Sequence, residues 1–344
     1  MTFFITKRGY LVIWIALGLF YLCCFFAGLI YGRYPVSGQQ IMAILIGNVP
    51  KGDNPDVLKT IVLDLRMPRL LIASIVGAAL ASAGGVFQGL LRNPLADPFT
   101  LGVSTGAAFG ATLALIAGVA SGVAIPMAAM LGALATLALV LLLSRDRQGL
   151  QPATMILAGI VVSTFLSALI SLIKSLDEES LAAIVFWMLG SFGGRDWSHV
   201  IFAAPYFIMG FFTVLAYARD LDLLSMGELE ARQLGVPVQR SRLVLMTASC
   251  LMTAAAVSIS GIIGFVGLVV PHMVRLLQGP RHGHLLVSSA ILGATVTVLA
   301  DLFAKNLLPS GEELPVGVLT TLIGGPFFCY LLWQKKRSEH KTFL

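Results

Sequence analysis

Charged residues are scarce in this sequence. Asp, Glu, Lys and Arg make up 12% of its 344 residues, about half of the share that is usual in soluble domains. Hydrophobic residues make up 57%, and the mean hydropathy is +0.90. The basic residues separate long apolar runs instead of clustering, so the net charge of +6 does not indicate a nucleic-acid partner. The composition predicts a polytopic membrane protein that is surrounded by lipid.

The sequence also lacks the motifs of an enzyme. Its four cysteines, all inside apolar runs, are Cys23, Cys24, Cys250 and Cys329. They show neither metal-ligand spacing nor a disulfide framework, so we expect them to act as small packing residues. No G-x-x-x-x-G-K-[ST] loop for nucleotide phosphates is present. We therefore predict that the chain itself is not an enzyme and binds no metal, nucleotide or other cofactor.

Ionisable residues are missing from the middle of the apolar runs. Ion-coupled carriers usually keep such groups at membrane depth, because those groups bind the coupling ion. Asp301 and His272 lie near the ends of their runs, where solvation of a helix end explains them better than function does. Such a protein either conducts passively or takes energy from a partner. A secondary transporter or channel is an alternative of much lower weight, as is a membrane enzyme.

The uncharged runs predict an all-α fold with about ten membrane spans. They are Gly9–Gly32, Leu70–Leu91, Pro98–Ser144, Gln148–Ile173, Trp197–Ala218, Leu243–Val274, His282–Ala300 and Leu314–Gln334. Two of them are long enough to fold back once, the third run near Ser121–Gly122 and the sixth near Ser258–Gly261. The chain, residues 1–344, is predicted to form a single transmembrane domain.

The distribution of Lys and Arg predicts the topology. With the N-terminus inside, 15 basic residues fall on inner segments and 8 on outer ones, which accounts for all 23. This excess favours both termini in the cytoplasm. The first run follows Lys7 and Arg8 and is too long for a signal peptide, so we expect it to remain as a span. Short outer helices are expected at Ser37–Ile46 and at Ser180–Leu189, before Gly190.

The stretch Leu224–Pro237, LSMGELEARQLGVP, is charged and lies between two apolar halves. Met226–Leu234 can form a short helix, which Gly235 followed by Pro237 would end. On the cytoplasmic side, this helix would be accessible to a soluble partner that pushes on it. An ordinary solvated loop helix explains the same residues about equally well.

Two further segments each have two interpretations. Arg92–Pro98, RNPLADP, contains Pro94 and Pro98, which disfavour helix at the residues before them. It is either an irregular lining or gate of a pathway, or a tight connecting turn. Arg66 and Arg69, at the outer end of the second span, either extend to lipid headgroups or bind carboxylates of an external partner.

Five segments, taken together, carry a specific family resemblance. They are Arg66–Arg69 (RMPR), Gly77–Gly106 (GAALASAGGVFQGLLRNPLADPFTLGVSTG), Gly227–Pro237 (GELEARQLGVP), Ser260–Arg275 (SGIIGFVGLVVPHMVR) and Glu313–Gly325 (ELPVGVLTTLIGG). In this order, across nearly the whole chain, they resemble the permease subunit of bacterial type II ABC importers. That family serves iron–siderophore complexes, haem and vitamin B12.

The resemblance implies a vitamin B12 permease-like fold of ten spans in the bacterial cytoplasmic (inner) membrane. It also implies a second permease subunit, identical or different, and two cytoplasmic ATP-binding subunits that use ATP and Mg²⁺. A periplasmic or lipoprotein substrate-binding protein would deliver the cargo. An iron–siderophore complex is the expected cargo, with haem or vitamin B12 (cobalamin) as the alternative.

The resemblance further implies roles for single residues. The residues that would couple to the ATPase are Gly227, Glu228, Ala231, Arg232, Leu234 and Gly235. Arg66, Arg69 and Lys305 match basic positions that dock the binding protein, although Lys305 stands where the vitamin B12 permease has an arginine. The residues that match the inner gate loop are Asn93, Pro94 and Leu95. The other half of that gate has hydroxyl residues in the relative but reads QPAT at Gln151–Thr154 here.

Overall fold

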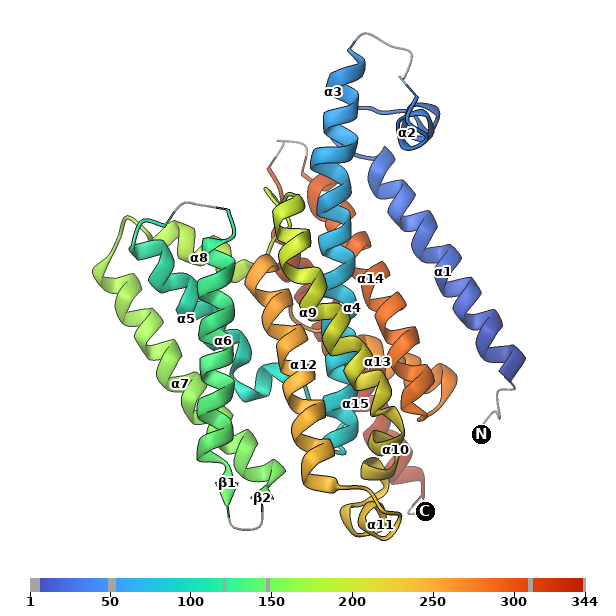
Figure 1. Cartoon of the computed structure of the whole chain (residues 1–344), viewed down its shortest axis with the longest axis vertical. Coiled ribbons are helices and arrows are strands. Elements are labelled where there is room, and N and C mark those ends of the chain that lie inside the picture. Colours follow the sequence, from blue (N-terminus) through green and yellow to red (C-terminus); the bar gives the residue numbers. More distant parts are fainter. Residues whose placement is uncertain (1–6, 49–53, 120–121, 147–148, 309–311, 343–344) are drawn as a thin grey trace.

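The computed structural model describes residues 7–48, 54–119, 122–146, 149–308 and 312–342, which form an almost entirely helical bundle (Figure 1). Its ten main helices are α1 (Lys7–Ile30), α4 (Met67–Leu90), α5 (Val103–Ile116), α6 (Ala124–Leu143), α7 (Pro152–Leu176), α9 (Trp197–Ala216), α12 (Val238–Ser260), α13 (Val266–Gln278), α14 (His282–Asn306) and α15 (Val316–Thr342). Among the described residues, seven helices are long and apolar enough to cross a membrane, and three shorter apolar helices complete the ten. The predicted all-α polytopic fold is confirmed.

Short elements connect the main helices. They are α2 (Gly38–Leu45), α3 (Pro55–Thr60), the π-helical turn η1 (Ile61–Arg66), the 3₁₀ turn η2 (Pro98–Leu101), β1 (Arg145–Asp146), β2 (Gly149–Leu150), α8 (Leu181–Leu189), α10 (Ala218–Met226) and α11 (Glu228–Gln233). In Figure 1, α2, α3 and α8 lie at the upper end of the bundle. The β1–β2 hairpin and α11 lie at the lower end, where α1 begins and α15 finishes.

Helix α4 is the centre of the bundle, because 20 of its 24 residues are buried. Its small residues allow neighbouring backbones to approach closely, as is typical of packed membrane helices. Gly77 lies against the Gly293 carbonyl group of α14, and Gly84 lies against the Gly267 carbonyl group of α13. A Cβ atom at either α4 glycine would overlap these backbone atoms. The glycines therefore fix how tightly α13 and α14 pack on α4.

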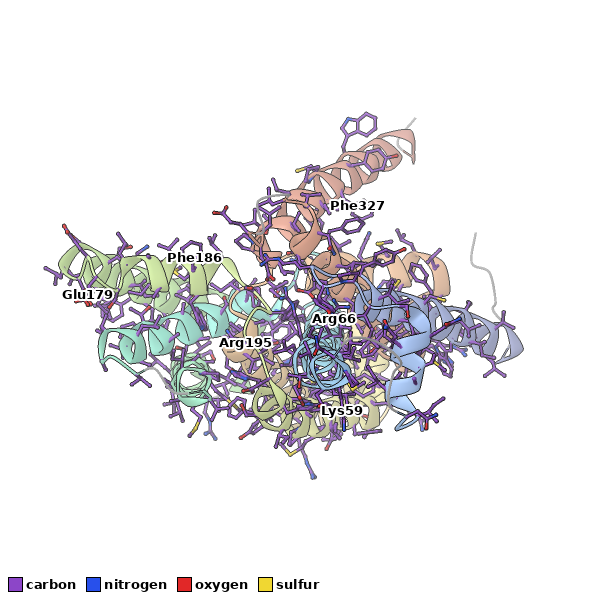
Figure 2. All side chains as sticks on the ribbon, turned by 90° about the horizontal axis from the view of Figure 1, so that it is seen from above. Lys59, Arg66, Glu179, Phe186, Arg195 and Phe327 are labelled. Carbon is purple, nitrogen blue, oxygen red and sulfur yellow. The ribbon has the colours of Figure 1, made fainter. Side chains whose placement is uncertain are left out.

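Helices α1, α7 and α9 lie at the periphery and leave most of their apolar surface uncovered. The most apolar window of α7 has a mean hydropathy of 2.5, yet only 22% of it is buried. Helix α15, which carries Phe327, projects from the bundle on a different side from α8, which carries Phe186 (Figure 2).

The packing role expected for the cysteines fits buried Cys24 and Cys250 but not Cys23 and Cys329, which are exposed.

Helix ends follow local signals that were visible in the sequence. Ser37 caps α2 in a capping box with Gln40, and α8 ends at Gly190, whose φ is +74°. Both predicted short helices are thus present, at Gly38–Leu45 and Leu181–Leu189. The predicted reversal near Ser258–Gly261 is also present, since α12 ends at Ser260 and α13 starts at Val266.

Some predicted boundaries are wrong. The second span does not start at Leu70, because α3, η1 and α4 form one helix from Pro55 to Leu90. Its charged first part, at the upper end, interrupts the apolar run on which the prediction relied. Helix α10 was missed for the same reason. The predicted turn near Ser121–Gly122 fits helices that end at Ile116 and resume at Ala124, but Ser121 lies outside the described residues.

Candidate functional site

An ion-paired cluster joins three elements at the upper end of the bundle. We name Arg69, Asp301, Lys305 and Glu313 the upper cluster. Arg69 of α4 donates from Nε and Nη2 to Asp301 of α14, at 3.0 and 2.7 Å. It also donates from Nη1 and Nη2 to Glu313, just before α15, at 3.1 and 2.8 Å. One guanidinium group therefore connects α4, α14 and the segment that leads into α15.

The two carboxylates of the upper cluster differ in accessibility. The Asp301 side chain is completely buried, whereas 31% of the Glu313 side chain is exposed. Lys305, one helical turn after Asp301, lies 3.8 Å from its Oδ2 atom. The solvated helix end expected for Asp301 is therefore wrong, because Arg69 and Lys305 neutralise a buried charge. Glu313 is the partner of Arg69 that solvent can reach.

Arg66 has a different role from Arg69. It is buried, and its guanidinium group donates to the carbonyl oxygens of Leu29, Ile30 and Tyr34. These carbonyl groups end α1 or follow it, where no intrahelical partner is available. Arg66 thus fixes the end of α1 on the central helix. The interpretation that its side chain extends to lipid headgroups is therefore wrong.

A basic cavity of about 430 Å³ lies over the upper cluster. Its charged lining residues are Arg33, Arg66, Arg69, Arg195, Asp196, Lys305 and Glu313. In the view from above, Arg66 and Arg195 lie near the middle of this face, while Glu179 lies at its edge (Figure 2). Five basic side chains and two acidic ones make this cavity suited to an added carboxylate. The structure therefore brings all three predicted docking residues, Arg66, Arg69 and Lys305, to one concave site.

Two carboxylates of this cavity are held in the charged form. Burial raises the pKa of Glu313, but the hydrogen bond from Arg69 and the positive charges nearby outweigh it and leave the pKa below its usual value. Hydrogen bonds from Ser198 and His199 lower the pKa of Asp196 to about 2. Both groups are therefore anionic at neutral pH.

At the lower end, α11 is a separate short helix with glycine at both ends. Gly227 breaks the chain between α10 and α11 with a φ of +156°, and a Cβ atom there would overlap the Glu230 carboxylate. Gly235 follows the helix with a φ of +84°. The helix is thus shorter than the predicted Met226–Leu234, because Gly227 separates Met226 from it.

The six predicted coupling residues do not share one face of α11. Ala231 is fully buried, so its role is to seat the helix on the bundle. Met226, Leu229 and Leu234 have 67%, 72% and 62% of their surface exposed. Large apolar side chains exposed around a charged helix are typical of a protein contact surface. Of these three, only Leu234 was among the predicted coupling residues.

Glu228 connects α11 to the bundle. Its carboxylate accepts from Arg232 at 2.7 Å and from Arg242 of α12 at 3.0 Å. Arg242 is buried and also donates to the carbonyl oxygen of Leu150 at 2.6 Å. The hydrogen bond from Arg242 is the main cause that lowers the pKa of Glu228 below its usual value. Glu228 therefore holds α11 in place, while Arg232, with 57% of its side chain exposed, points to solvent.

The predicted gate loop lies beside α11. Asn93 accepts a hydrogen bond from the Leu95 backbone N–H at 3.0 Å and so shapes the turn around Pro94. Leu95 has 41% of its surface exposed. Arg92, with a φ of +48°, lines a cavity of about 410 Å³ together with Gly227, Glu228 and Arg232 among others. Arg92 and α11 are more than a hundred residues apart in the sequence, but both line this cavity, whereas the predicted gate residues Asn93, Pro94 and Leu95 do not.

Helix α10 is tied to the neighbouring helices by two carboxylates. Asp222 accepts from the backbone N–H of His282 at 2.8 Å, and its Oδ1 lies 2.6 Å from the His282 Nδ1 atom. It thereby satisfies an N–H group in the first turn of α14. Asp220 accepts from the hydroxyl group of Ser241 on α12. A displacement of α10 and α11 is therefore resisted by both α12 and α14.

Within the described part of the chain, no group of three His, Cys, Asp or Glu side chains could hold a metal ion. The groups that gather at the two ends are suited to ion pairing with other proteins instead.

Comparison with protein families agrees with this arrangement, since the model described as the FecCD transport family matches residues 19–334. The chain belongs to the FecCD transport family. It is a multi-pass membrane permease of the ABC transporter class.

Individual FecCD relatives have different stated cargoes. The Fe(3+) dicitrate transport system permease protein FecD of Escherichia coli is 41% identical over 79% of this chain and 85% of its own length. The cobalamin import system permease protein BtuC of Halobacterium salinarum is also 41% identical, over 82% of this chain and 76% of its own length. Overall identity therefore does not distinguish between these cargoes.

A solved structure shares the FecCD fold along nearly the whole chain. It is assigned to the metal-chelate type of ABC transporter in an inward-facing conformation. The TM-score is 0.83 at 37% identity, and the match covers 94% of this chain and 99% of that one. Such a likeness along nearly the whole chain confirms the predicted class of permease.

Sequence reasoning missed the partners of the predicted residues. Asp301 and Glu313 were not predicted to bind Arg69. The four-residue spacing of Asp301 and Lys305 was a usable signal that these two side chains pair. Nothing in the local sequence shows that Arg242 reaches Glu228 and Leu150, because those contacts depend on how α11, α12 and the hairpin pack.

Proposed function

We propose that this FecCD permease forms half of the translocation pathway of an ATP-driven importer for a metal chelate. It pairs with a second permease subunit, identical or different, in the bacterial cytoplasmic membrane. Two cytoplasmic ATP-binding subunits supply the energy, and a periplasmic or lipoprotein binding protein delivers the cargo. The contact of α11 and Arg92 with one cavity supports this function most directly, because Arg92 directly precedes the gate residues Asn93, Pro94 and Leu95.

We infer that the lower end faces the cytoplasm. The excess of Lys and Arg on the segments predicted to be inside supports this orientation. In it, both termini and α11 are cytoplasmic, and the exposed Leu229 and Leu234 contact a groove of the ATPase. Movement of α11 then reaches Arg92 through the cavity that they share, and the gate residues Asn93, Pro94 and Leu95 directly follow Arg92 in the chain.

At the opposite end, the upper cluster receives the binding protein. Arg69 keeps Asp301 as a permanent partner, because that carboxylate is fully buried. Glu313 is partly exposed, so a carboxylate of the binding protein can replace it on the guanidinium group of Arg69. Lys305 and Arg66 add positive charge to the same cavity. Docking would in this way release the segment that leads into α15.

An iron–siderophore complex is the cargo that we propose. The metal-chelate assignment of the similar structure and the ferric dicitrate relative support it. Haem and cobalamin are the alternatives, and the equally similar cobalamin relative supports the second of them. A wide, unspecific pathway is compatible with all three, so selection belongs to the binding protein.

The test is reconstitution of the chain in liposomes with its ATPase and its binding protein. Ferric siderophore, haem and cobalamin are offered in turn, and both ATP hydrolysis and uptake are measured. Stimulated hydrolysis and uptake with ferric siderophore are expected. The control is the same complex with an ATPase subunit that cannot hydrolyse ATP. Uptake that persists in this control would contradict the importer and favour an ion-coupled carrier.

A further inference from the structure

A third cavity lies at the lower end, where α6, the β1–β2 hairpin and the first turns of α12 meet. We name it the side cavity; its volume is about 600 Å³. Leu141, Leu142 and Leu243 give it apolar walls, and its charged lining residues are Arg145 and Arg240. It differs from the cavity beside α11, where acidic and basic residues occur together.

The wall of the side cavity is held in place by hydrogen bonds. The backbone N–H of Leu150 donates to Gln239 Oε1 at 3.0 Å, and the carbonyl oxygen of Leu150 accepts from Arg242 at 2.6 Å. Gly149 has a φ of +99°, and a Cβ atom there would overlap the Gln239 side chain. The hairpin is thus fixed against α12, and the cavity is preformed, as ligand sites usually are.

Two arginines of the side cavity have no acidic partner within the described side chains. Arg145 comes from the hairpin and Arg240 from α12, and both are exposed. In contrast, Arg232 and Arg242, which lie nearby in the sequence, both bind Glu228. Two guanidinium groups on separate elements, without an acidic partner among the described side chains, can bind the oxygens of one phosphate group, because their planar donors match its geometry.

The apolar walls indicate which phosphate compound fits. Leu142 has 72% of its surface exposed and Leu243 has 42%. Both lie at the end of membrane-crossing helices, at the depth where lipid headgroups meet acyl chains. A free phosphate ion would not use these leucines. We propose that the side cavity binds an anionic phospholipid, with its phosphate group between Arg145 and Arg240 and its acyl chains on Leu142 and Leu243.

The position of the site gives the lipid a specific effect. Gln239 and Arg242 form the wall of the side cavity or support it, and Arg242 also holds Glu228 of α11. A bound lipid therefore stabilises the base of α11. This inference does not depend on the proposed cargo or on the proposed orientation, because it requires only a lipid leaflet at the lower end.

Lipid binding by the purified full chain in detergent tests the proposal. Phosphatidylglycerol and phosphatidylcholine with identical acyl chains are compared by native mass spectrometry and by thermal unfolding, with inorganic phosphate as a third ligand. We expect one phosphatidylglycerol per chain at a preference on the order of tenfold or more, given two arginine contacts near the membrane surface. Inorganic phosphate at the same concentration should not shift the unfolding temperature.

Matched variants make the test specific. Arg145→Gln with Arg240→Gln should abolish the preference for phosphatidylglycerol. The control, Arg219→Gln with Arg281→Gln, removes the same charge at the lower end from residues outside the side cavity and should keep it. Equal binding of the two lipids, retention by the first variant, loss in the control, or an equal shift with phosphate would each overturn the proposal.

A measurement on the unaltered chain covers the case in which the first variant does not fold. Photoreactive phosphatidylglycerol in liposomes should label the segments 138–145 and 239–243 in preference to other lipid-exposed segments. The labelling should persist after the ATPase has been added. Uniform labelling, or loss of labelling on assembly, would mean that lipid binds without a site or that a protein surface covers the side cavity.

Discussion

The upper cluster and the group around Glu228 contain the same kinds of side chain in opposite settings. In the upper cluster, a fully buried Asp301 is the centre, and the accessible group, Glu313, is at the rim. Around Glu228, the buried group is the cation Arg242, and the accessible one is Arg232. Both ends thus combine one fixed partner with one exposed partner. A charged cluster of this kind can therefore hold the bundle together through its buried member and bind another protein through its exposed member.

Asp301→Asn should have the largest effect on stability. It removes the negative charge that compensates Arg69 and Lys305, and loss of one partner from a buried ion pair costs about 3–5 kcal/mol. The apparent free energy of unfolding in mixed micelles measures it. Asp64→Asn is the control, because Asp64 is exposed near the same end of the bundle. Equal values for both variants would mean that Asp301 is not the centre of the upper cluster.

Arg242→Ala should have a smaller but clear effect. It leaves the buried carbonyl oxygen of Leu150 without its side-chain donor, which costs about 1–3 kcal/mol for an unsatisfied buried group, and it removes one of the two donors to Glu228. The same unfolding measurement applies. Arg240→Ala, two residues earlier and exposed, should change stability by at most about 0.5 kcal/mol. A similar loss in both variants would contradict the assigned contacts.

Glu313→Gln should change stability by less than about 1 kcal/mol, since this pair is partly exposed. The affinity for the binding protein should rise several-fold, because Gln competes less strongly for Arg69. Surface plasmon resonance with the reconstituted complex measures the affinity. Glu312→Gln, at the exposed neighbouring residue, is the matched control. Weaker docking by Glu313→Gln would show that Glu313 assists the binding protein and is not replaced by it.

Arg232→Ala should alter stability least, by about 0.3–0.5 kcal/mol for an exposed i,i+4 pair. Cargo-stimulated ATP hydrolysis should nevertheless fall. Arg219→Ala on α10 provides the control at an exposed arginine outside α11. Unchanged stimulation would make α11 an ordinary solvated helix.

Glu228→Ala does not separate coupling from stability, because it also leaves the buried Arg242 without its carboxylate partner.

The pH dependence of the Glu228 contact should be confined to acid. Its pKa in the folded chain is below the usual value because Arg242 and Arg232 stabilise the carboxylate. The contact therefore contributes fully above the unfolded pKa and is lost as the pH falls through the folded one. The difference in stability between the wild type and Glu228→Gln should stay constant from about pH 6 to 8 and shrink below about pH 4. A change between pH 6 and 8 would contradict the lowered pKa.

The sequence predicted elements better than it predicted partners. Apolar runs are sufficient to find membrane helices, and the capping residues show where α2 begins, after Ser37, and where α8 ends, at Gly190. Helix α10 and the first part of the helix that ends at Leu90 were missed, because their charges interrupt the apolar pattern. Hydropathy also failed to separate the buried α4 from the peripheral α7. Burial depends on small residues that permit close packing and not on how apolar the helix is.

The same limit applies to the candidate sites. The roles of Arg69, Lys305 and Glu228 were predicted from the family resemblance, and the structure brings each residue into a charged group. Their partners Asp301, Glu313 and Arg242 come from distant segments, so only the packed helices bring them together. The accessible leucine Leu229 was missed as well, since a short helix does not indicate from its sequence which side will be covered.

The glycine contacts of α4 have a mechanical consequence. Gly77 and Gly84 leave no space between the backbones of α4, α13 and α14, so these helices cannot slide closer or tilt without a steric clash. They form a rigid block, and packed interiors respond to force by moving as a unit more readily than by deforming. The peripheral α1 is under no such restriction at its glycines, because Gly18 has open space around it and Gly28 meets only the side chain of Leu70. A transport cycle in this chain would therefore use a stationary frame, with its moving parts attached at the edges.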